Sequence, residues 1–193
     1  MGALQFIRSV SRDNPVPSID YIRTSCGIFH DCIVHDFDMV CQIAQSTPEE
    51  IFSFGSCFIP EIGSTGDLDN VVVSLRFASG LLASVDVNRS SAYGYDQRIE
   101  VFGSLGMLQA ENRPQNLVVR STGEGIARPP VDHSFPTRYR DAYRAELECF
   151  LDCVHGDREV PITHDQVRRS YVVADSAERS FREGRPVRIG EPY

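Results

Sequence analysis

The sequence predicts an α+β fold in which helices cover one face of an open, largely antiparallel sheet. Residues 50–121 consist of short β-branched and aromatic runs with period-two alternation, separated by turn residues. Helical spacing of apolar residues occurs only before and after this region. Strands and helices in separate stretches favour an α+β layer over alternating βαβ units. The 193 residues show no internal repeat and no convincing boundary, so one domain over residues 1–193 is expected.

The first element is a predicted strand over residues 3–11, whose loose alternation stops before Pro15 and Pro17. Both prolines favour an extended connection and exclude a helix there. After Gly27 a helix is predicted because apolar residues recur three and four positions apart, and Thr47–Pro48 ends it. The apolar residues with this spacing are Ile33, Phe37, Val40, Cys41 and Ala44.

Two hairpins are predicted in the β-rich region. Val71–Phe77 and Leu81–Val87 flank a turn that contains glycine, and so do Arg98–Phe102 and Met107–Ala110. Because the hairpins follow one another, the sequence predicts an antiparallel meander within a group of about six strands. The alternation predicts one buried face and one face that is more polar or covered by a partner.

The last third of the chain is predicted to be a loop followed by two helices. Residues 122–136 are rich in Gly, Pro and polar groups and are expected to form the loop. Tyr139–Val154 carries one apolar stripe, and residues 164–183 form the second helical stretch, which ends at Gly184 and Pro186. The stripe consists of Tyr143, Leu147, Phe150, Leu151 and Val154.

Composition excludes several classes of function. The formal charge of −8 and the pI of about 5.1 leave no basic face for nucleic acid or anionic membranes. No apolar run approaches the ~20 residues of a membrane helix and the first residues lack a signal-peptide core, so a cytoplasmic location is expected. All 19 basic residues are arginine, which excludes lysine chemistry from this chain. The 6 cysteines form no C-x-x-C motif and are expected to be free thiols.

The densest polar cluster is His30–Asp38. Within it Asp31 and His35 are four positions apart, so on a continuous helix they are neighbours on one face. A carboxylate beside an imidazole stabilises its charged form, as a general base near neutral pH requires. From spacing alone, a solvated acidic helix face with an incidental histidine is the more common explanation. A metal site formed by Asp31, His35 and Asp38 is a third possibility, although no H-E-x-x-H motif or second ligand segment is present.

Two further segments contain candidate binding residues. Tyr93–Arg98 places two tyrosines around a glycine at the start of a predicted strand, where Tyr95 could present its hydroxyl to a polyol, although such aromatics more often serve packing. Gly123–Gly125 resembles the start of a dinucleotide-binding loop. Arg128 stands where the third glycine belongs, however, and no strand-loop-helix surrounds it, so no Rossmann fingerprint is present.

Several of these segments together resemble a known family. Ser25–Asp38 is similar to the G-G-x-x-x-D-x-x-x-H-D-x-D segment of the glucose-fructose oxidoreductase, inositol dehydrogenase and rhizopine catabolism (Gfo/Idh/MocA) family. Ser11–Pro15, Tyr93–Asp96 and Val101–Met107 occur in the same order as in its inositol dehydrogenase branch. The first glycine of the family motif is Cys26 here, and the Asp and His stay in register.

The resemblance implies a fold and a set of site residues. The chain corresponds to the C-terminal substrate domain, an open and largely antiparallel sheet that also serves oligomerisation in the family. The substrate-contacting Asn, the Asp, the catalytic base and the polyol-contacting Tyr of the family match Asn14, Asp31, His35 and Tyr95. Asp31 is then expected to orient His35 and to bind substrate as well.

The resemblance also marks a departure, because the family's N-terminal dinucleotide-binding domain and its E-K-P lysine are missing from these residues. The implied activity is oxidation of a CH–OH group of a cyclic polyol or sugar, with NAD or NADP held mainly by the missing domain and with no metal. An alternative is a non-catalytic module that binds polyols or assembles with full-length paralogues. A metal-dependent enzyme is a third. A homo-oligomer or a paralogue complex through the sheet face is the expected assembly.

Overall fold

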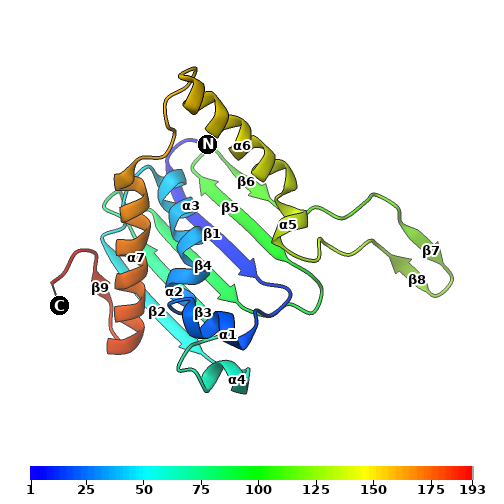
Figure 1. Ribbon diagram of the computed structural model, residues 1–193, viewed down its shortest axis with the longest axis horizontal. Coiled ribbons are helices and arrows are strands. Elements are labelled where there is room, and N and C mark those ends of the chain that lie inside the picture. Colours follow the sequence, from blue (N-terminus) through cyan, green and yellow to red (C-terminus); the bar gives the residue numbers. More distant parts are fainter. Residues whose placement is uncertain (193) are drawn as a thin grey trace.

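The computed structural model describes residues 1–192 and is built around a seven-stranded sheet with the order β6-β5-β1-β4-β3-β2-β9 (Figure 1). β1 is parallel to β4, and the other neighbouring strands of this sheet are antiparallel. A separate hairpin pairs β7 with β8. The strands are β1 (Leu4–Arg12), β2 (Glu50–Ser56), β3 (Asn70–Arg76), β4 (Leu82–Asn88), β5 (Asp96–Gly103), β6 (Gly106–Ala110), β7 (Arg120–Thr122), β8 (Gly125–Ala127) and β9 (Val187–Arg188).

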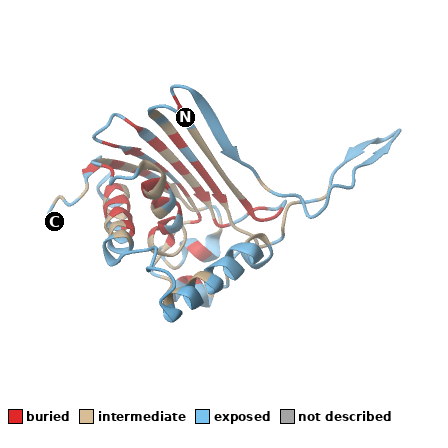
Figure 2. Ribbon diagram, turned by 90° about the horizontal axis from the view of Figure 1, so that it is seen from above, coloured by how far each residue is buried: buried red, intermediate tan, exposed pale blue. Residues whose placement is uncertain are grey.

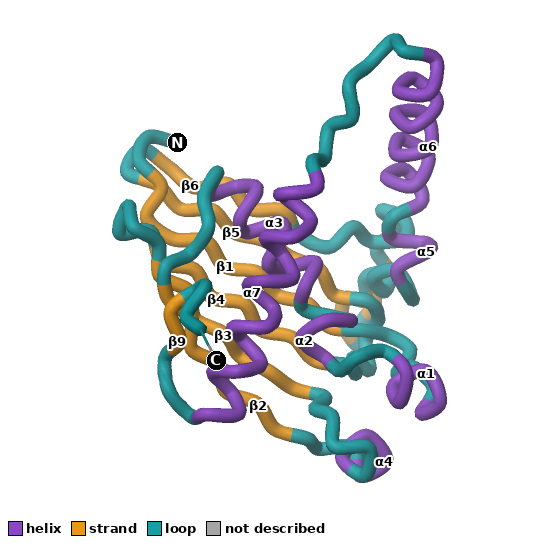
Figure 3. Tube along the Cα trace, turned by 60° about the vertical axis from the view of Figure 1, so that its left-hand side comes forward, coloured by secondary structure: helices purple, strands orange, loops and turns teal. Residues whose placement is uncertain are grey.

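Helices cover one face of this sheet, and the predicted α+β class is confirmed. α2, α3 and α7 lie across that face, whereas none of the described helices lies on the opposite face (Figures 1 and 3). The helices are α1 (Ile19–Thr24), α2 (Ile28–Asp31), α3 (Val34–Ala44), α4 (Pro60–Gly63), α5 (Phe135–Arg138), α6 (Arg140–His155) and α7 (His164–Glu183). None of the helices in residues 1–192 has the length and apolar character needed to cross a bilayer.

The core lies between the sheet and the α3–α7 layer (Figure 2). Period-two alternation on β3 buries Val71 and Val73 against the helices and leaves Val72 exposed on the other face. Phe37 of α3 and Val173 of α7 are fully buried in the same cluster. Each such side chain contributes on the order of 1.5–3 kcal/mol by leaving water. The 6 cysteines are free thiols, as expected.

The predicted meander is wrong, because β1 lies between the two predicted hairpins. β3 pairs with β4 and β5 pairs with β6, as the turn signals indicate, but β4 and β5 each pair with β1. β1 is suited to this central position because Ile7, Ser9, Val10 and Ser11 are all buried. Turn residues determine local pairing only, and they carry no information about a strand inserted from far away in the sequence.

The predicted loop over residues 122–136 is wrong in part. It contains the end of β7, the whole of β8 and the start of α5. β7 and β8 have 3 residues each, too few for alternation to be recognised in the sequence, and all of them are exposed. Their hairpin projects from the body of the molecule (Figure 1).

The two C-terminal helices differ in their packing. α7 spans the predicted residues 164–183, begins with a Thr163–Gln166 capping box and ends at Gly184 in the left-handed conformation. α6 is also a helix close to its predicted bounds, but it has no buried residue and stands away from the sheet (Figure 3). The apolar stripe of α6 is therefore exposed in this chain.

Candidate active site

Three strand ends meet at one edge of the sheet, and the candidate residues gather there. Arg12 at the end of β1 is in register with Asn88 at the end of β4 and with Asp96 at the start of β5. Asp13 and Arg89 directly follow the two parallel strands. Residues that are distant in the sequence thus become neighbours, as is usual where parallel strands end side by side.

The helix that was expected to carry both Asp31 and His35 is interrupted between them. α2 ends at Asp31 and α3 begins at Val34. Between them the Ile33 N–H donates to the Ile28 carbonyl, five residues back instead of four. This wide turn changes the rotation of the chain, so the prediction that Asp31 and His35 share one continuous helix face is wrong.

Asp31 is held by two partners other than His35. The Tyr21 hydroxyl donates to Oδ1 at 2.5 Å, and Nη1 of Arg89 donates to Oδ2 at 2.8 Å. The hydrogen bond to Asp31, followed by burial, raises the pKa of Tyr21 to about 12. The Asp31 side chain keeps 13% of its surface exposed. It therefore retains lone pairs that can accept hydrogen bonds from a ligand.

Arg89 lies completely inside the protein and connects Asp31 to Asp67. Its Nη2 donates to Asp67 Oδ2 at 3.2 Å, and the side chain has 0% exposure. Asp67 Oδ1 also accepts from the Ile28 N–H at 3.0 Å. Because Gly27 at the start of α2 has no side chain to cap the helix, Asp67 supplies the cap from another segment.

His35 is exposed in the first turn of α3, and in residues 1–192 its ring has no hydrogen-bond partner. The charge of His35 acts on two other carboxyls, Asp13 and Asp36. The Asp31 carboxylate is instead bound by Tyr21 and Arg89, so the expected pairing of Asp31 with His35 is not formed. A ring nitrogen of His35 is free to exchange a proton with a ligand.

Asp13 lies at the centre of this group. Sγ of Cys32 donates to its Oδ2 at 3.0 Å. Burial raises the pKa of Asp13; the Cys32 hydrogen bond and the Arg89 charge oppose this, whereas Asp31 adds to it. Burial also raises the pKa of Cys32 well above its ordinary value, which keeps the thiol protonated and able to donate.

Asp36 anchors α3 to β1. Its Oδ1 accepts from the hydroxyls of Ser9 at 2.6 Å and Ser11 at 2.7 Å, and the residue is buried. Burial raises the pKa of Asp36, and the two serine hydrogen bonds oppose that shift. Since Asp36 directly follows His35, this contact fixes the position of His35 on the sheet.

Asn14 connects the end of β1 to the segment before α5. Its Nδ2 donates to the His133 carbonyl at 2.7 Å and lies 3.0 Å from the His133 Nδ1. The side-chain Oδ1 of Asn14 has no hydrogen-bond partner in the part of the chain that the structure describes. Asn14 therefore lies at the end of β1 and still has an acceptor for a ligand hydroxyl.

Tyr95 is packed among aromatic rings. Its ring centroid lies 5.9 Å from Tyr139 and 6.4 Å from Phe135. Burial, and then the neighbouring Tyr139, raise the pKa of Tyr95, and the charge of Asp13 acts in the same direction. The phenol is thus held neutral, with Tyr139 as its hydrogen-bond partner.

Of the three residues of the metal hypothesis, the two carboxylates are directed to different partners and the His35 ring has none in residues 1–192. Asp38 accepts from the Ser170 hydroxyl at 2.8 Å, whereas Asp31 is bound to Arg89 and Tyr21. No group of three metal-binding side chains forms within residues 1–192. The arrangement gives no support to a metal centre built from Asp31, His35 and Asp38.

Within residues 1–192 no element fits the phosphates of a dinucleotide. Gly123–Gly125, the segment considered above, forms the turn of the β7–β8 hairpin. A phosphate-binding loop instead requires a strand, a glycine-rich turn and the N-terminus of a helix. The described residues therefore do not fit a nicotinamide dinucleotide by themselves.

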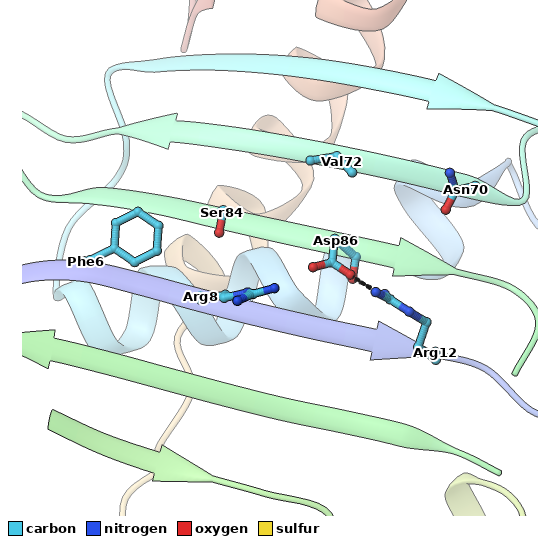
Figure 4. A pocket seen from close by; sticks show the side chains of 7 residues that line it. All are labelled: Phe6, Arg8, Arg12, Asn70, Val72, Ser84 and Asp86. Atoms are coloured by element: carbon cyan, nitrogen blue, oxygen red, sulfur yellow. Dashed lines mark hydrogen bonds and ion pairs between the residues drawn. The ribbon is translucent and has the colours of Figure 1, made fainter. Parts of the chain in front are cut away.

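The opposite face of the sheet carries a shallow hollow (Figure 4). Arg12 and Asp86 form an ion pair inside it. This hollow is separate from the candidate site because its side chains lie on the face away from α3 and α7. The lining residues are Phe6, Arg8, Arg12, Asn70, Val72, Ser84 and Asp86.

Sequence reasoning missed the groups that hold Asp31. Tyr21, Asp67 and Arg89 lie in three separate segments, and no local spacing relates them. Asp13 lies inside the Ser11–Pro15 segment that resembles the family, but no role was predicted for it. A charged residue two positions after a predicted strand, as Asp13 and Arg89 are, was the one available signal.

Comparison with known proteins gives a consistent result. The family model described as "GFO/IDH/MocA C-terminal domain" matches residues 1–109. The myo-inositol 2-dehydrogenase of Thermotoga maritima is 40% identical over 192 residues, which cover 99% of this chain and 58% of the relative. The scyllo-inositol 2-dehydrogenase (NAD(+)) of Bacillus subtilis is 29% identical over 190 residues, covering 98% of this chain and 55% of the relative.

A solved structure shares the fold over nearly the whole chain. A putative myo-inositol dehydrogenase from Sinorhizobium meliloti 1021 has a TM-score of 0.94 and 37% identity, covering 98% of this chain and 58% of that structure. The chain therefore spans somewhat more than half the length of the relatives that it matches.

Proposed function

This chain belongs to the GFO/IDH/MocA family through its C-terminal domain, and from that premise we propose that it is the substrate-binding half of a polyol dehydrogenase. The proposed substrate is a cyclic polyol of the inositol class. The single observation that supports this best is that Asn14 and Tyr95 lie beside the paired ends of β1 and β5, where Asp13 is bound by Cys32, the neighbour of Asp31. Carboxylate, amide and phenol groups at one place are suited to a ring that carries many hydroxyls.

Each side chain has a role in this proposal. His35 accepts the proton of the reacting hydroxyl, since its ring is exposed and has no partner in the described chain. Asp31, Asn14 and Tyr95 bind the other hydroxyls and orient the polyol ring. Both oxygens of Asp31 are engaged by Tyr21 and Arg89, so in this proposal Asp31 binds substrate and does not orient His35.

The hydride acceptor belongs outside these residues. A relative named as NAD(+)-dependent makes a nicotinamide cofactor the reasonable partner, but the described residues do not fit its phosphates. We therefore assign no step of hydride transfer to this chain. Whether the cofactor is NAD or NADP depends on residues that contact the ribose, which lie in the nucleotide-binding part of such enzymes.

The remaining expectations stay proposals. We also propose that residues 1–193 form one domain, that the protein is cytoplasmic and that it assembles through the open sheet face. The fold is consistent with each of these proposals. A non-catalytic polyol-binding or assembly module remains the alternative function, because the chain spans 58% of its relative.

The experiment compares the chain alone with a hybrid that carries the nucleotide-binding part of a relative. We expect the folded chain alone to bind myo-inositol in calorimetric titration and to reduce no NAD, because turnover needs a positioned nicotinamide. The hybrid should oxidise inositol. Turnover by the chain alone would contradict the division of roles. A folded hybrid that binds NAD but neither binds nor oxidises inositol would contradict the proposed substrate.

A further inference from the structure

One arrangement of charged side chains has no role in the function proposed above. A buried arginine spans the two ends of the one-turn helix that carries Asp31. α2 has 4 residues, too few to be stable in isolation. Its start is capped by Asp67 and its end carries Asp31, and Arg89 binds both carboxylates.

The guanidinium is well suited to fix a carboxylate. It is planar, keeps its charge and directs separate N–H donors to Asp31 and Asp67. Burial by itself lowers the pKa of Arg89, but surrounding groups that include Asp31 and Asp67 outweigh burial and raise it. A completely buried cation is strongly destabilising without such partners, so the contact persists while the fold persists.

The backbone of Arg89 is held in place by a hydrogen bond at the end of the sheet. Its N–H donates to the Asp69 carbonyl at 2.8 Å directly after β4. The side chain therefore reaches the α2 segment from the sheet itself. On Asp31, Arg89 occupies one oxygen and Tyr21 the other, which restricts rotation of the carboxylate.

We propose that Arg89, anchored by Asp67, is the positioning residue of this site and holds the Asp31 carboxylate in one orientation for hydroxyl recognition. This proposal rests on the proposed function, because Asp31 is taken there as a polyol ligand. Arg89 itself has no exposed surface and acts through Asp31. An ionised carboxylate is only an acceptor, so it selects ligands with hydroxyl donors.

The first measurement reports orientation and needs no substrate. Three-bond NMR couplings between Asp31 Cγ and its backbone N and C′ distinguish one side-chain rotamer from an average. We expect one rotamer in the unaltered chain, averaged values in Arg89→Met and an intermediate result in Arg89→Lys. Arg12→Met breaks the Arg12–Asp86 pair on the opposite face and is the matched control, which should leave the couplings unchanged.

A second variant protects the test against unfolding of Arg89→Met. In Asp67→Asn the amide oxygen can still accept from the Ile28 N–H, while the charge that anchors Arg89 is removed. We expect this variant to fold and to show partial averaging of Asp31. A single unchanged rotamer in folded Arg89→Met, or in folded Asp67→Asn if the first variant does not fold, would overturn the proposal.

The second measurement is myo-inositol affinity in two backgrounds. Arg89→Met should weaken binding about tenfold or more in the unaltered chain, the size of a lost charge-assisted contact, and cause no further loss in Asp31→Asn. Equal losses in both backgrounds would show that Arg89 does not act through Asp31. If Asp31 averages as expected but the unaltered chain does not bind inositol, the positioning role stands and the proposed polyol function fails.

Discussion

At the scale of single residues, His35 combines an exposed ring with a fixed backbone. Asp36, the next residue, is tied to Ser9 and Ser11 of β1, so the first turn of α3 cannot move freely. A proton acceptor requires both properties, since it must reach the substrate and remain in place. In the hybrid enzyme we expect His35→Ala to lower turnover by ~10²–10⁴ with little change in NAD affinity.

His30 provides the matched control for His35. Its Nε2 lies 2.8 Å from Asp175 and its ring stacks on Tyr171, both on α7. His30→Ala should leave turnover unchanged and reduce the free energy of unfolding by about 1 kcal/mol, as for a hydrogen-bonded pair with one exposed partner. Equal losses of turnover in both variants would show that this segment is structural.

The ionisation of Asp36 and that of Asp96 should change the free energy of unfolding with pH in opposite directions. Burial raises the pKa of Asp36, so its folded form binds a proton more readily than its unfolded form. Native stability then falls as pH rises from the ordinary aspartate value through the raised one. Asp36→Asn cannot titrate and keeps the acceptor for both serines. Its free energy of unfolding, relative to the native chain, should therefore increase with pH across this window.

Asp96 is the internal comparison. Burial alone would raise its pKa, but hydrogen bonds from Arg98, Tyr93 and Asn112 outweigh burial and lower it. The stability from Asp96 is present above the ordinary aspartate pKa and is lost as pH falls through the lowered value. Asp96→Asn should thus be less stable than the native chain at neutral pH, and the difference should shrink in acid. Urea unfolding between pH 3 and 8 measures both, and parallel trends would contradict this assignment.

Cys26 tests a departure from the family motif. It replaces the first motif glycine and keeps a left-handed backbone, with φ of 66°. This conformation costs a residue with a Cβ about 1–2 kcal/mol relative to glycine. Cys26→Gly should raise the free energy of unfolding by about 1 kcal/mol, as measured by urea titration. Ser25→Gly, at a φ of −83°, should lower it. A loss of stability in Cys26→Gly would show that the thiol contributes more than the turn costs.

At the scale of elements, local signals in the sequence predicted most of the fold. The capping residues of α7 and the turn residues between β3 and β4 and between β5 and β6 act over a few positions, and these elements formed as expected. The insertion of β1 between β4 and β5 and the wide turn at Ile33 depend on contacts between distant segments. Periodicity over a short window carries no information about either.

The two amphipathic helices α3 and α6 should respond differently to the same substitution. Phe37 of α3 is fully buried, whereas Phe150 of α6 is 61% exposed. Phe37→Ala removes a core ring and should lower the free energy of unfolding by about 3–5 kcal/mol. Phe150→Ala should change it by less than about 0.5 kcal/mol. Chemical denaturation measures both, and comparable losses would mean that α6 packs on the body in solution.

At the scale of the whole molecule, the candidate site depends on the fold more than on any motif. The resemblance supplied Asn14, Asp31, His35 and Tyr95, and the fold gathers them around the ends of β1, β4 and β5. Arg89 reaches Asp31 and Asp67 only after the sheet and α2 have assembled. Because each of these contacts joins separate segments, a single sequence could not reveal them.

The open face of the sheet leads to the last prediction. Phe54 and Val72 are cross-strand neighbours on this face and are 67% and 45% exposed. Leu82, Phe102 and Met107 are also exposed there, on three further strands. An apolar surface of this kind is unusual on an isolated domain and marks an interaction site. We expect the chain to self-associate through it, with an isologous contact as in most homodimers.

Sedimentation velocity at micromolar concentration should show this association. Val72→Glu places a charge at the centre of the open face without touching the core, so it should shift the distribution to monomers and leave thermal stability nearly unchanged. Leu147→Glu is the matched control, because it places the same charge on the exposed stripe of α6, away from the sheet. If the unaltered chain is a single monomeric species, or if Leu147→Glu disrupts the assembly as strongly as Val72→Glu, the open face is not the surface that joins the copies.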